Sequence, residues 1–308
     1  MNIRRSEDIP ETADPLEREP TDRNVRCLLN YMGGKGAMVP FILPIVYRIP
    51  HVQYIEPFGG GAALLLAKRP SAIEIYNDAD SAIVNLFRVI RDPDRFDRFK
   101  FLCENTPYSR EEFNNFRDTW RNVEDPVDRA HQFFLHLRMS FGGTGTSYGM
   151  QLSPKRKGPD AVKGIISQLE EVRDRIRDVY VENRDFRDIF TLYDSPTSLF
   201  LADPPYVPDT RRGGKYTHEL TVADHQELVA ILLRLQGKAI LCGYNHPVYD
   251  VLVDHGWLRR SVGITCSLAG RTRVSGLQGE GRVSEQQQRE ESVWISPGAE
   301  RSPRTLLG

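Results

Sequence analysis

Residues 52–78 read VQYIEPFGGGAALLLAKRPSAIEIYND, and this stretch decides the fold class. VQYIEPF and AIEIYND are short apolar runs with the length and composition of buried strands. AALLLAKR between them has the composition of a helix, and SAIVNLFRVIRD, which follows, places its apolar residues at helical spacing. A strand, a glycine-rich turn, a helix and a second strand form a βαβ unit, which predicts a parallel sheet covered by helices.

The same pattern returns in the second half of the chain. TSLFLAD (197–203) and KAILCGY (238–244) are predicted strands, and TVADHQELVAILLRLQ (221–236) is a predicted helix that begins at Thr221 or Asp224. A last strand, SVWIS, follows a polar, glycine-rich stretch that is typical of a loop. We therefore expect one α/β domain with a doubly wound, Rossmann-like sheet.

An insertion separates the two halves of this sheet. Residues 91–177 are charged and mostly helical in pattern, with one glycine-rich break, which favours an inserted subdomain. The predicted organisation is a core domain built from residues 25–90 and 178–299, an insertion at 91–177, and flexible tails at 1–24 and 300–308.

Composition limits the possible partners. The chain has 308 residues, with 41 Lys and Arg against 42 Asp and Glu, so a nucleic-acid site must be a local basic cluster. Cys27, Cys103, Cys242 and Cys266 lack metal-ligand spacing and suit a reducing cytoplasm. The longest apolar stretch is too short, and too interrupted by proline, to span a bilayer. We expect a soluble, cytoplasmic protein with no metal and no membrane partner.

The glycine-rich turn is the first candidate binding site. Gly59, Gly60 and Gly61 stand between a strand and a helix, where missing side chains let a ligand approach the backbone. The stretch fits G-x-G-x-x-G except that Leu64 replaces the last glycine. Asp78 closes the second strand, at the place from which an acid binds ribose hydroxyls in dinucleotide and S-adenosylmethionine sites. A plain tight turn, and a helix N-cap at Asp78, are the alternative interpretations.

The second candidate site is LADPPY at 201–206. Proline cannot donate to a β-ladder, so the strand stops at Asp203 and a rigid acidic loop follows. Such a loop suits methylation of an exocyclic base amine. If the Asp203 carboxylate and the Pro204 carbonyl each accept one N–H, the nitrogen lone pair leaves conjugation and the developing positive charge is stabilised. The ring of Tyr206 would stack on a flipped base, so Phe is expected to serve equally there. The alternative is an ordinary proline turn.

Four motifs in this order resemble the DNA adenine methylase family. YMGGKGAMVPFI resembles its N-terminal aromatic-x-Gly-Gly-Lys motif, YIEPFGGGAALLL its cofactor loop, IYNDADSAIVNLFRVI its ribose-binding acid and helix, and LFLADPPY its catalytic loop. The resemblance implies a class I methyltransferase fold and methyl transfer from S-adenosylmethionine to adenine N6 in double-stranded DNA. Lys35 would then bind the methionine carboxylate. The implied cofactor contacts are Tyr31, Lys35, Phe58, Gly59, Gly61, Asp78, Asp185, Phe186 and Asp203.

Two basic clusters are candidate contacts for DNA phosphates. Either could equally be a solvated loop. Family members that read short palindromes carry a hairpin rich in Asn, Arg and Tyr, where this chain has the glycines and threonines of FFLHLRMSFGGTGTSYGM, so no recognition sequence carries over. The clusters are Lys155, Arg156 and Lys157, and, after the catalytic loop, Arg211, Arg212 and Lys215.

Two other functions fit the same motifs. A cytosine-N4 methyltransferase uses the same amine chemistry, but such enzymes more often have Ser in place of Asp203. The other alternative is a catalytically inactive nucleic-acid-binding protein on this fold. The intact motif residues Asp203, Tyr206 and Lys35 argue against it. Because an amine nucleophile needs no covalent enzyme intermediate, transfer is expected to be direct. Asn245, His225 and His246 are interpreted as structural residues.

Overall fold

The structure is a computed structural model of the chain. It describes residues 27–29, 35–150, 158–210, 218–265 and 288–299. Both predicted tails lie outside the described residues. Within these ranges no helix is both long enough and apolar enough to span a membrane.

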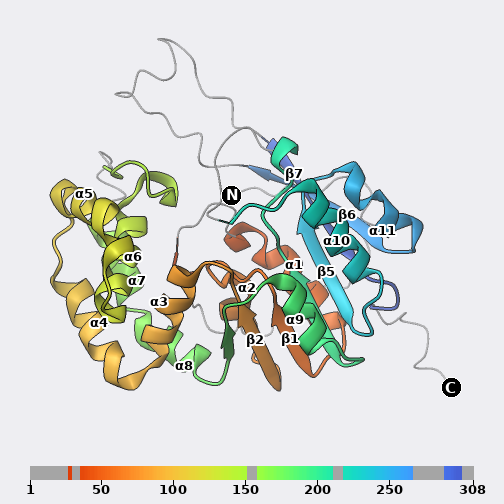
Figure 1. The fold of residues 1–308 in the computed structure, drawn as a ribbon, viewed down its shortest axis with the longest axis horizontal. Helices are drawn as coiled ribbons and strands as arrows, with labels where there is room; N and C mark the ends of the chain where they lie inside the picture. Colours follow the sequence, from red (N-terminus) through yellow and green to blue (C-terminus); the bar gives the residue numbers. More distant parts are fainter. Residues whose placement is uncertain (1–26, 30–34, 151–157, 211–217, 266–287, 300–308) are drawn as a thin grey trace, which may run out of the picture.

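A seven-stranded sheet forms the centre of the described structure (Figure 1). Five neighbouring strands are parallel, whereas β7 runs antiparallel between β5 and β6. Ile55 lies opposite both Ile75 and Phe200, so the two sequence halves meet at this point of the sheet. The expected doubly wound, Rossmann-like sheet is confirmed. The strands, in spatial order, are β3 (Tyr180–Glu182), β2 (Ile73–Asn77), β1 (Gln53–Glu56), β4 (Ser198–Ala202), β5 (Lys238–Gly243), β7 (Gln288–Ile295) and β6 (Leu258–Thr265).

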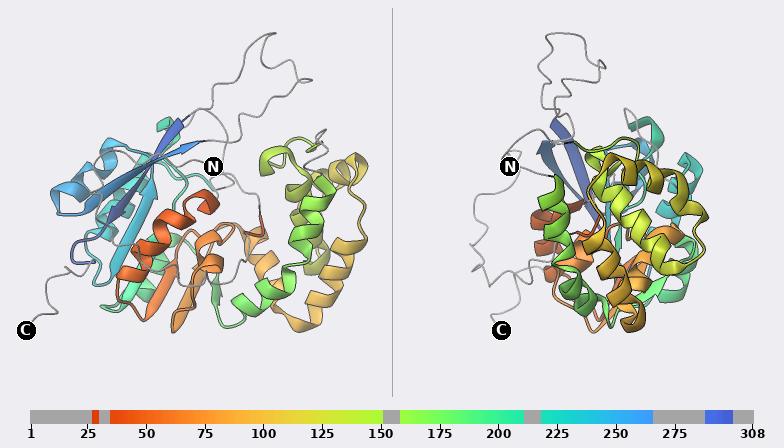
Figure 2. Two further views of the ribbon diagram at one scale, coloured as in Figure 1. Left: turned by 180° about the vertical axis from the view of Figure 1, so that it is seen from behind. Right: turned by 90° about the vertical axis from the view of Figure 1, so that its left-hand side faces the viewer.

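Helices cover both faces of the sheet, as Figures 1 and 2 show from opposite sides. Side chains alternate along each strand: Tyr54 joins the core on one face and Ile55 the core on the other. The predicted helix start at Thr221 is confirmed, because Thr221 and Asp224 form a reciprocal capping box. One face carries α1 (Val39–Arg48), α2 (Ala63–Ala67) and α3 (Ser81–Arg91), and the other α9 (Phe186–Tyr193), α10 (Val222–Leu232) and α11 (Asp250–Asp254).

The expected helical insertion follows β2 and α3 in the sequence and precedes β3, and in space it lies beside the sheet (Figure 1). The first three of its helices begin at capping residues: Asp92, Ser109 and Asp125 each accept a hydrogen bond from a backbone N–H of the first turn. The insertion shares one continuous hydrophobic core with α3 and the sheet. The assigned domain boundaries remain predictions. The helices are α4 (Pro93–Asn105), α5 (Arg110–Thr119), α6 (Pro126–Met139), α7 (Gly158–Ile166) and α8 (Leu169–Ile176).

The strand order reverses between β1 and β4, and this reversal locates the site. Connections leave β1 and β4 in opposite directions, so a crevice opens at the carboxyl ends of the parallel strands. The glycine turn follows β1 and the Asp203 loop follows β4. The two candidate sites of the sequence therefore belong to one crevice.

Candidate active site

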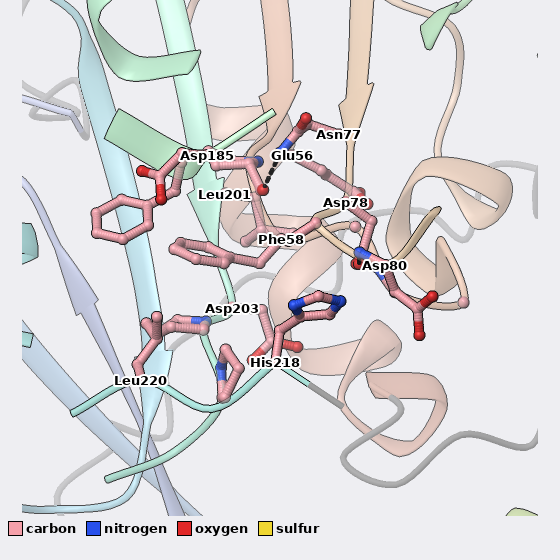
Figure 3. Close-up of a pocket in the computed structure, with 18 of the residues that line it drawn as sticks. Glu56, Phe58, Asn77, Asp78, Asp80, Asp185, Leu201, Asp203, His218 and Leu220 are labelled. Carbon is pink, nitrogen blue, oxygen red and sulfur yellow. Dashed lines mark hydrogen bonds between the residues drawn. The ribbon is translucent and has the colours of Figure 1, made fainter. Parts of the chain in front are cut away.

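A cavity of about 480 Å³ occupies the carboxyl edge of the sheet (Figure 3). Loops that follow β1, β2, β3 and β4 line it, and so does the segment before α10. Figure 3 shows Phe58, Asp78, Asp185 and Asp203 around this space. The cavity therefore brings together the cofactor candidates that the structure describes and the catalytic candidates Asp203 and Pro204, whereas Tyr206 is not among the residues that line it.

The glycine turn is shaped mainly by protein neighbours. A Cβ on Gly59 would lie 2.1 Å from the Tyr76 ring, and one on Gly61 would lie 2.6 Å from the Cys27 sulfur. Tyr76 and Cys27 thus fill the spaces that side chains at Gly59 and Gly61 would need, and the expectation that these glycines let a ligand approach the backbone stays a prediction. Gly60 has a positive φ of 48° and open space beside it. All three glycines still line the cavity with their backbone.

Asp78 joins the first two loops. Its carboxylate accepts hydrogen bonds from the backbone N–H groups of Gly60 and Asp80, both at 2.8 Å. The alternative interpretation of Asp78 as the N-cap of α3 is wrong, because Asp80 caps that helix by accepting from Ala82 N–H. Burial raises the pKa of Asp78 to about 6, although the two N–H donors oppose the rise. Asp78 therefore holds the turn in shape and also presents a carboxylate to the cavity.

Two aromatic rings form the next wall. Phe58 and Phe186 pack with their ring centroids 5.2 Å apart. The guanidinium of Arg187 lies over the Phe186 ring, 4.4 Å from its centroid. Asp185 caps α9 by accepting from Arg187 N–H at 2.9 Å. The structure thus places the cofactor candidates Phe58, Phe186 and Asp185 together at the cavity, beside Arg187, which sequence reasoning missed.

The catalytic loop is held by a lysine from the start of the chain. The Lys35 ammonium lies 2.7 Å from Asp203 Oδ1 and also donates to the Tyr206 hydroxyl. In the structure Lys35 therefore contacts the catalytic loop, and its predicted contact with the methionine carboxylate stays a prediction. Burial disfavours its ammonium, but the charge of Asp203 and its neighbours outweighs burial and raises the pKa of Lys35 well above its usual value. Lys35 is therefore a cation at neutral pH.

Tyr206 and Glu291 complete this cluster. The Tyr206 hydroxyl donates to Glu291 Oε2 at 2.9 Å, and the same oxygen lies 3.6 Å from the Lys35 ammonium. Tyr206 is only 4 % exposed, and its ring meets Tyr244 edge-on at 4.5 Å between centroids. The hydroxyl thus has two partners that the sequence did not indicate, and the expectation that Phe would serve equally at this position no longer follows. We call Lys35, Asp203, Tyr206 and Glu291 the cavity cluster.

Asp203 itself lies at the cavity wall with 20 % of its side chain exposed. Burial raises the pKa of Asp203 to about 6, Lys35 opposes the rise, and Glu291 adds to it. At neutral pH the cluster therefore contains an ionised carboxylate that faces the cavity beside a fixed cation. Such a group can accept a hydrogen bond from an amine.

The described residues that line the cavity carry more acidic than basic groups. Sequence reasoning assigned no role to Glu56 at the end of β1, where burial raises the pKa of its carboxyl to about 7. The excess of acidic over basic side chains at the cavity favours a ligand with positive charge. Seven carboxylic acids (Glu56, Asp78, Asp80, Asp185, Asp203, Glu219 and Asp224) stand against three Lys or Arg side chains (Lys35, Arg184 and Arg187).

A protein-family model described as "D12 class N6 adenine-specific DNA methyltransferase" matches residues 31–260. The chain belongs to this family. A search of curated proteins finds no match. The resemblance inferred from the four motifs is confirmed, and so is adenine-N6 methylation of DNA as the activity. Glu291 of β7 lies beyond the matched residues.

Several predicted residues of the methyltransferase lie outside the described ranges, and their roles stay predictions. They are the cofactor candidate Tyr31 and the DNA candidates Lys155, Arg156, Lys157, Arg211, Arg212 and Lys215.

Of the residues interpreted as structural, His225 and His246 fit that interpretation, and for Asn245 it stays a prediction. His246 accepts from Val248 N–H at the start of a short helical turn, and the buried His225 lies 2.9 Å from the Tyr249 hydroxyl. The part of the chain that the structure describes contains no group of three or more His, Cys, Asp or Glu side chains placed to hold a metal ion.

Proposed function

We propose that this methyltransferase binds S-adenosylmethionine in the 480 Å³ cavity and transfers the methyl group directly to N6 of an adenine flipped out of double-stranded DNA. The observation that carries the proposal is the Asp203 carboxylate, which Lys35 holds at the wall of an acidic cavity. A cavity of this volume lies within the usual range for small ligands, about 300–1,000 Å³.

The cavity chemistry fits S-adenosylmethionine better than a dinucleotide. S-adenosylmethionine carries a sulfonium and an ammonium, which an excess of carboxylates attracts, whereas the same excess repels a pyrophosphate. In this proposal Asp78 accepts hydrogen bonds from the ribose hydroxyls and the rings of Phe58 and Phe186 contact the adenine base of the cofactor; that all three line the cavity supports these roles. The backbone N–H groups that Asp78 already binds keep its carboxylate in place.

Asp203 performs the central step of the proposed mechanism. S-adenosylmethionine supplies a methyl group activated by a positively charged sulfur. The Asp203 carboxylate and the Pro204 carbonyl accept the two N–H groups of the adenine amine, so its lone pair points toward the methyl group. The positive charge that develops on nitrogen then faces a carboxylate already oriented by Lys35. The proton leaves the nitrogen after transfer, toward solvent or an ionised carboxylate.

The position of Asp203 requires the base to leave the duplex. Since only a fifth of the Asp203 side chain is exposed, an adenine stacked between its neighbours has no path to the carboxylate. We assign contacts with the duplex to the helical insertion and the two predicted basic clusters.

A cysteine intermediate is disfavoured by burial. Cys242 on β5 interacts electrostatically with Asp203 and Lys35, but it is fully buried, and burial raises the pKa of its thiol well above the usual value. A protonated, inaccessible thiol is a poor nucleophile. Cys27, Cys103 and Cys242 are free thiols, which supports our proposal of a reducing, cytoplasmic location.

Nucleoside analysis tests this proposal. DNA treated with the enzyme and methyl-labelled S-adenosylmethionine should carry the label in N6-methyladenine, and DNA built without adenine should remain unlabelled. Label in N4-methylcytosine would contradict the assignment of the target base. Calorimetry should show that S-adenosylmethionine binds while NAD does not, and tight NAD binding would contradict the cofactor assignment.

A further inference from the structure

Glu291 lies on β7, 88 positions beyond Asp203 in the numbering of the chain, yet the two carboxylates share one lysine. We propose that Glu291 is a positioning residue for methyl transfer: its carboxylate holds Tyr206 and Lys35, and through them orients Asp203. This proposal rests on the function proposed above and assigns a role to a strand beyond the family match.

The contacts connect three parts of the fold: Lys35, the loop after β4, and strand β7. The Tyr206 hydroxyl donates to Glu291 Oε2 at 2.9 Å and accepts from Lys35. Lys35 in turn lies 2.7 Å from Asp203 and 3.6 Å from Glu291. Since β7 pairs with both β5 and β6, Glu291 is fixed to the rigid sheet, whereas Asp203 and Tyr206 belong to a loop. The loop is thus attached to the sheet by side chains.

The loop needs such an attachment because of its prolines. Pro204 and Pro205 have no backbone N–H, so these two positions cannot be anchored by donating hydrogen bonds to a neighbouring strand. Tyr206 is the first residue after them, and its side chain reaches the sheet through Glu291. A hydrogen bond that holds Tyr206 therefore also limits the movement of Asp203, three residues earlier.

Glu291 also acts through its negative charge, in addition to holding Tyr206 by a hydrogen bond. A neutral amide could accept the same hydrogen bond from Tyr206, whereas a second carboxylate raises the pKa of Asp203. The cavity cluster thus holds two carboxylates and one lysine, and Cys242 and Tyr249 interact electrostatically with Asp203 from elements packed against it. An excess of negative charge stabilises positive charge that develops beside Asp203.

Two substitutions separate attachment from charge. Glu291→Ala removes both, and kcat should fall by about 10- to 100-fold, the effect of losing a charged hydrogen-bond partner, while KM for S-adenosylmethionine and for DNA stays within about twofold. Glu291→Gln keeps an acceptor for Tyr206, so it should lose less than about 10-fold. Without the Glu291 charge Asp203 ionises more easily, so the acidic limb of its pH–rate profile should move to lower pH.

The neighbouring Glu290 provides a matched control, since it lies on the same strand with 64 % of its side chain exposed. Glu290→Ala should leave kcat and the pH profile unchanged. Tyr206→Phe removes the same hydrogen bond as Glu291→Ala, so the double variant should lose clearly less than the product of the two single effects.

The outcomes separate this inference from the proposed function. A wild-type chain that transfers no methyl group to adenine overturns both. An active wild type with unchanged kcat in Glu291→Ala, or with an unshifted acidic limb in Glu291→Gln, overturns the inference alone. The Gln variant keeps the test decisive if the Ala variant fails to fold.

Discussion

Two buried clusters in this protein each contain a lysine, a tyrosine ring and a carboxylate, and they differ in charge. In the cavity cluster, Lys35 lies 4.5 Å from the centroid of the Tyr206 ring and pairs with Asp203. At the C-terminal end of α2, Lys68 lies 4.3 Å from the centroid of the Tyr54 ring and pairs with Glu74. We call Lys68, Glu74, Tyr54 and Arg175 the interlock cluster, because Arg175 comes from α8 of the insertion.

The balance of charge separates the two clusters. In the interlock cluster Arg175 binds Glu74 through two nitrogens, at 2.6 and 2.9 Å, so one carboxylate faces two cations. Burial would raise the pKa of Glu74, but Arg175 and Lys68 outweigh burial and lower it. The cavity cluster has two carboxylates and one lysine, and the pKa of Asp203 is raised. Similar residues thus join the insertion to the sheet in the interlock cluster, whereas in the cavity cluster they leave an excess of negative charge that a ligand can face.

The largest expected effect is on stability, in the interlock cluster. Glu74→Ala leaves Lys68 and Arg175 buried without their carboxylate, so the free energy of unfolding should fall by about 3–5 kcal/mol. Glu170→Ala is the control: Glu170 also contacts a lysine, Lys100 at 2.6 Å, but it is 59 % exposed, and its loss should change the free energy of unfolding little. Denaturant titration measures both. Equal losses would show that burial does not distinguish these ion pairs.

The next effect is on catalysis, in the cavity cluster. Asp203→Ala should lower methyl transfer by a factor on the order of 10²–10³, as expected for removal of one preorganised electrostatic group. Asp203→Asn should retain DNA binding with a reduced rate, since it keeps one acceptor oxygen without the charge. Asp209→Asn, in the same loop but 68 % exposed, should behave like wild type. Full activity of Asp203→Ala in a labelled-methyl assay would refute the mechanism.

The two clusters also show what sequence can and cannot predict. The βαβ unit, the glycine turn and the Asp203 loop depend on residues close together in the chain, and all three were found from local patterns. Glu291 and Arg175 reach their partners only through the fold, from β7 and α8. Strand β6 was missed because Arg259 and Arg260 interrupt its apolar residues, as is common at a sheet edge.

A smaller effect is expected on cofactor binding. Asp78→Asn keeps an acceptor for one of its two backbone N–H partners but loses the charge at the cavity wall. S-adenosylmethionine affinity should fall by about 1.5–3 kcal/mol, while DNA affinity changes little. Asp92→Asn is a matched control, because Asp92 also accepts a backbone N–H but caps α4 in the insertion. If a calorimetric titration shows that Asp78→Asn binds S-adenosylmethionine with wild-type affinity, the assignment of the ribose to this loop is wrong.

The smallest effect concerns Glu56, which joins the two clusters. It lines the cavity and accepts a hydrogen bond at 2.8 Å from Tyr54, whose ring lies beneath Lys68. Its pKa is raised from 4.5 to about 7, so the folded state holds a proton that the unfolded chain has already lost between these values. Glu56 therefore supports folding fully below about pH 4.5, and this contribution is lost as pH rises through about 7.

Glu56→Gln removes the cost of ionising this buried group and keeps an acceptor for Tyr54. In the ligand-free protein it should add about 1 kcal/mol to the free energy of unfolding at pH 8 and little at pH 5, where Glu56 is already neutral; the new amide N–H groups limit the gain. Glu182→Gln serves as the control, since Glu182 also accepts from a tyrosine, Tyr193 at 2.8 Å, but is 27 % exposed. Denaturant titrations at the two pH values measure the difference. A gain of the same size at both would mean that packing, and not the charge of Glu56, links the cavity to the interlock cluster.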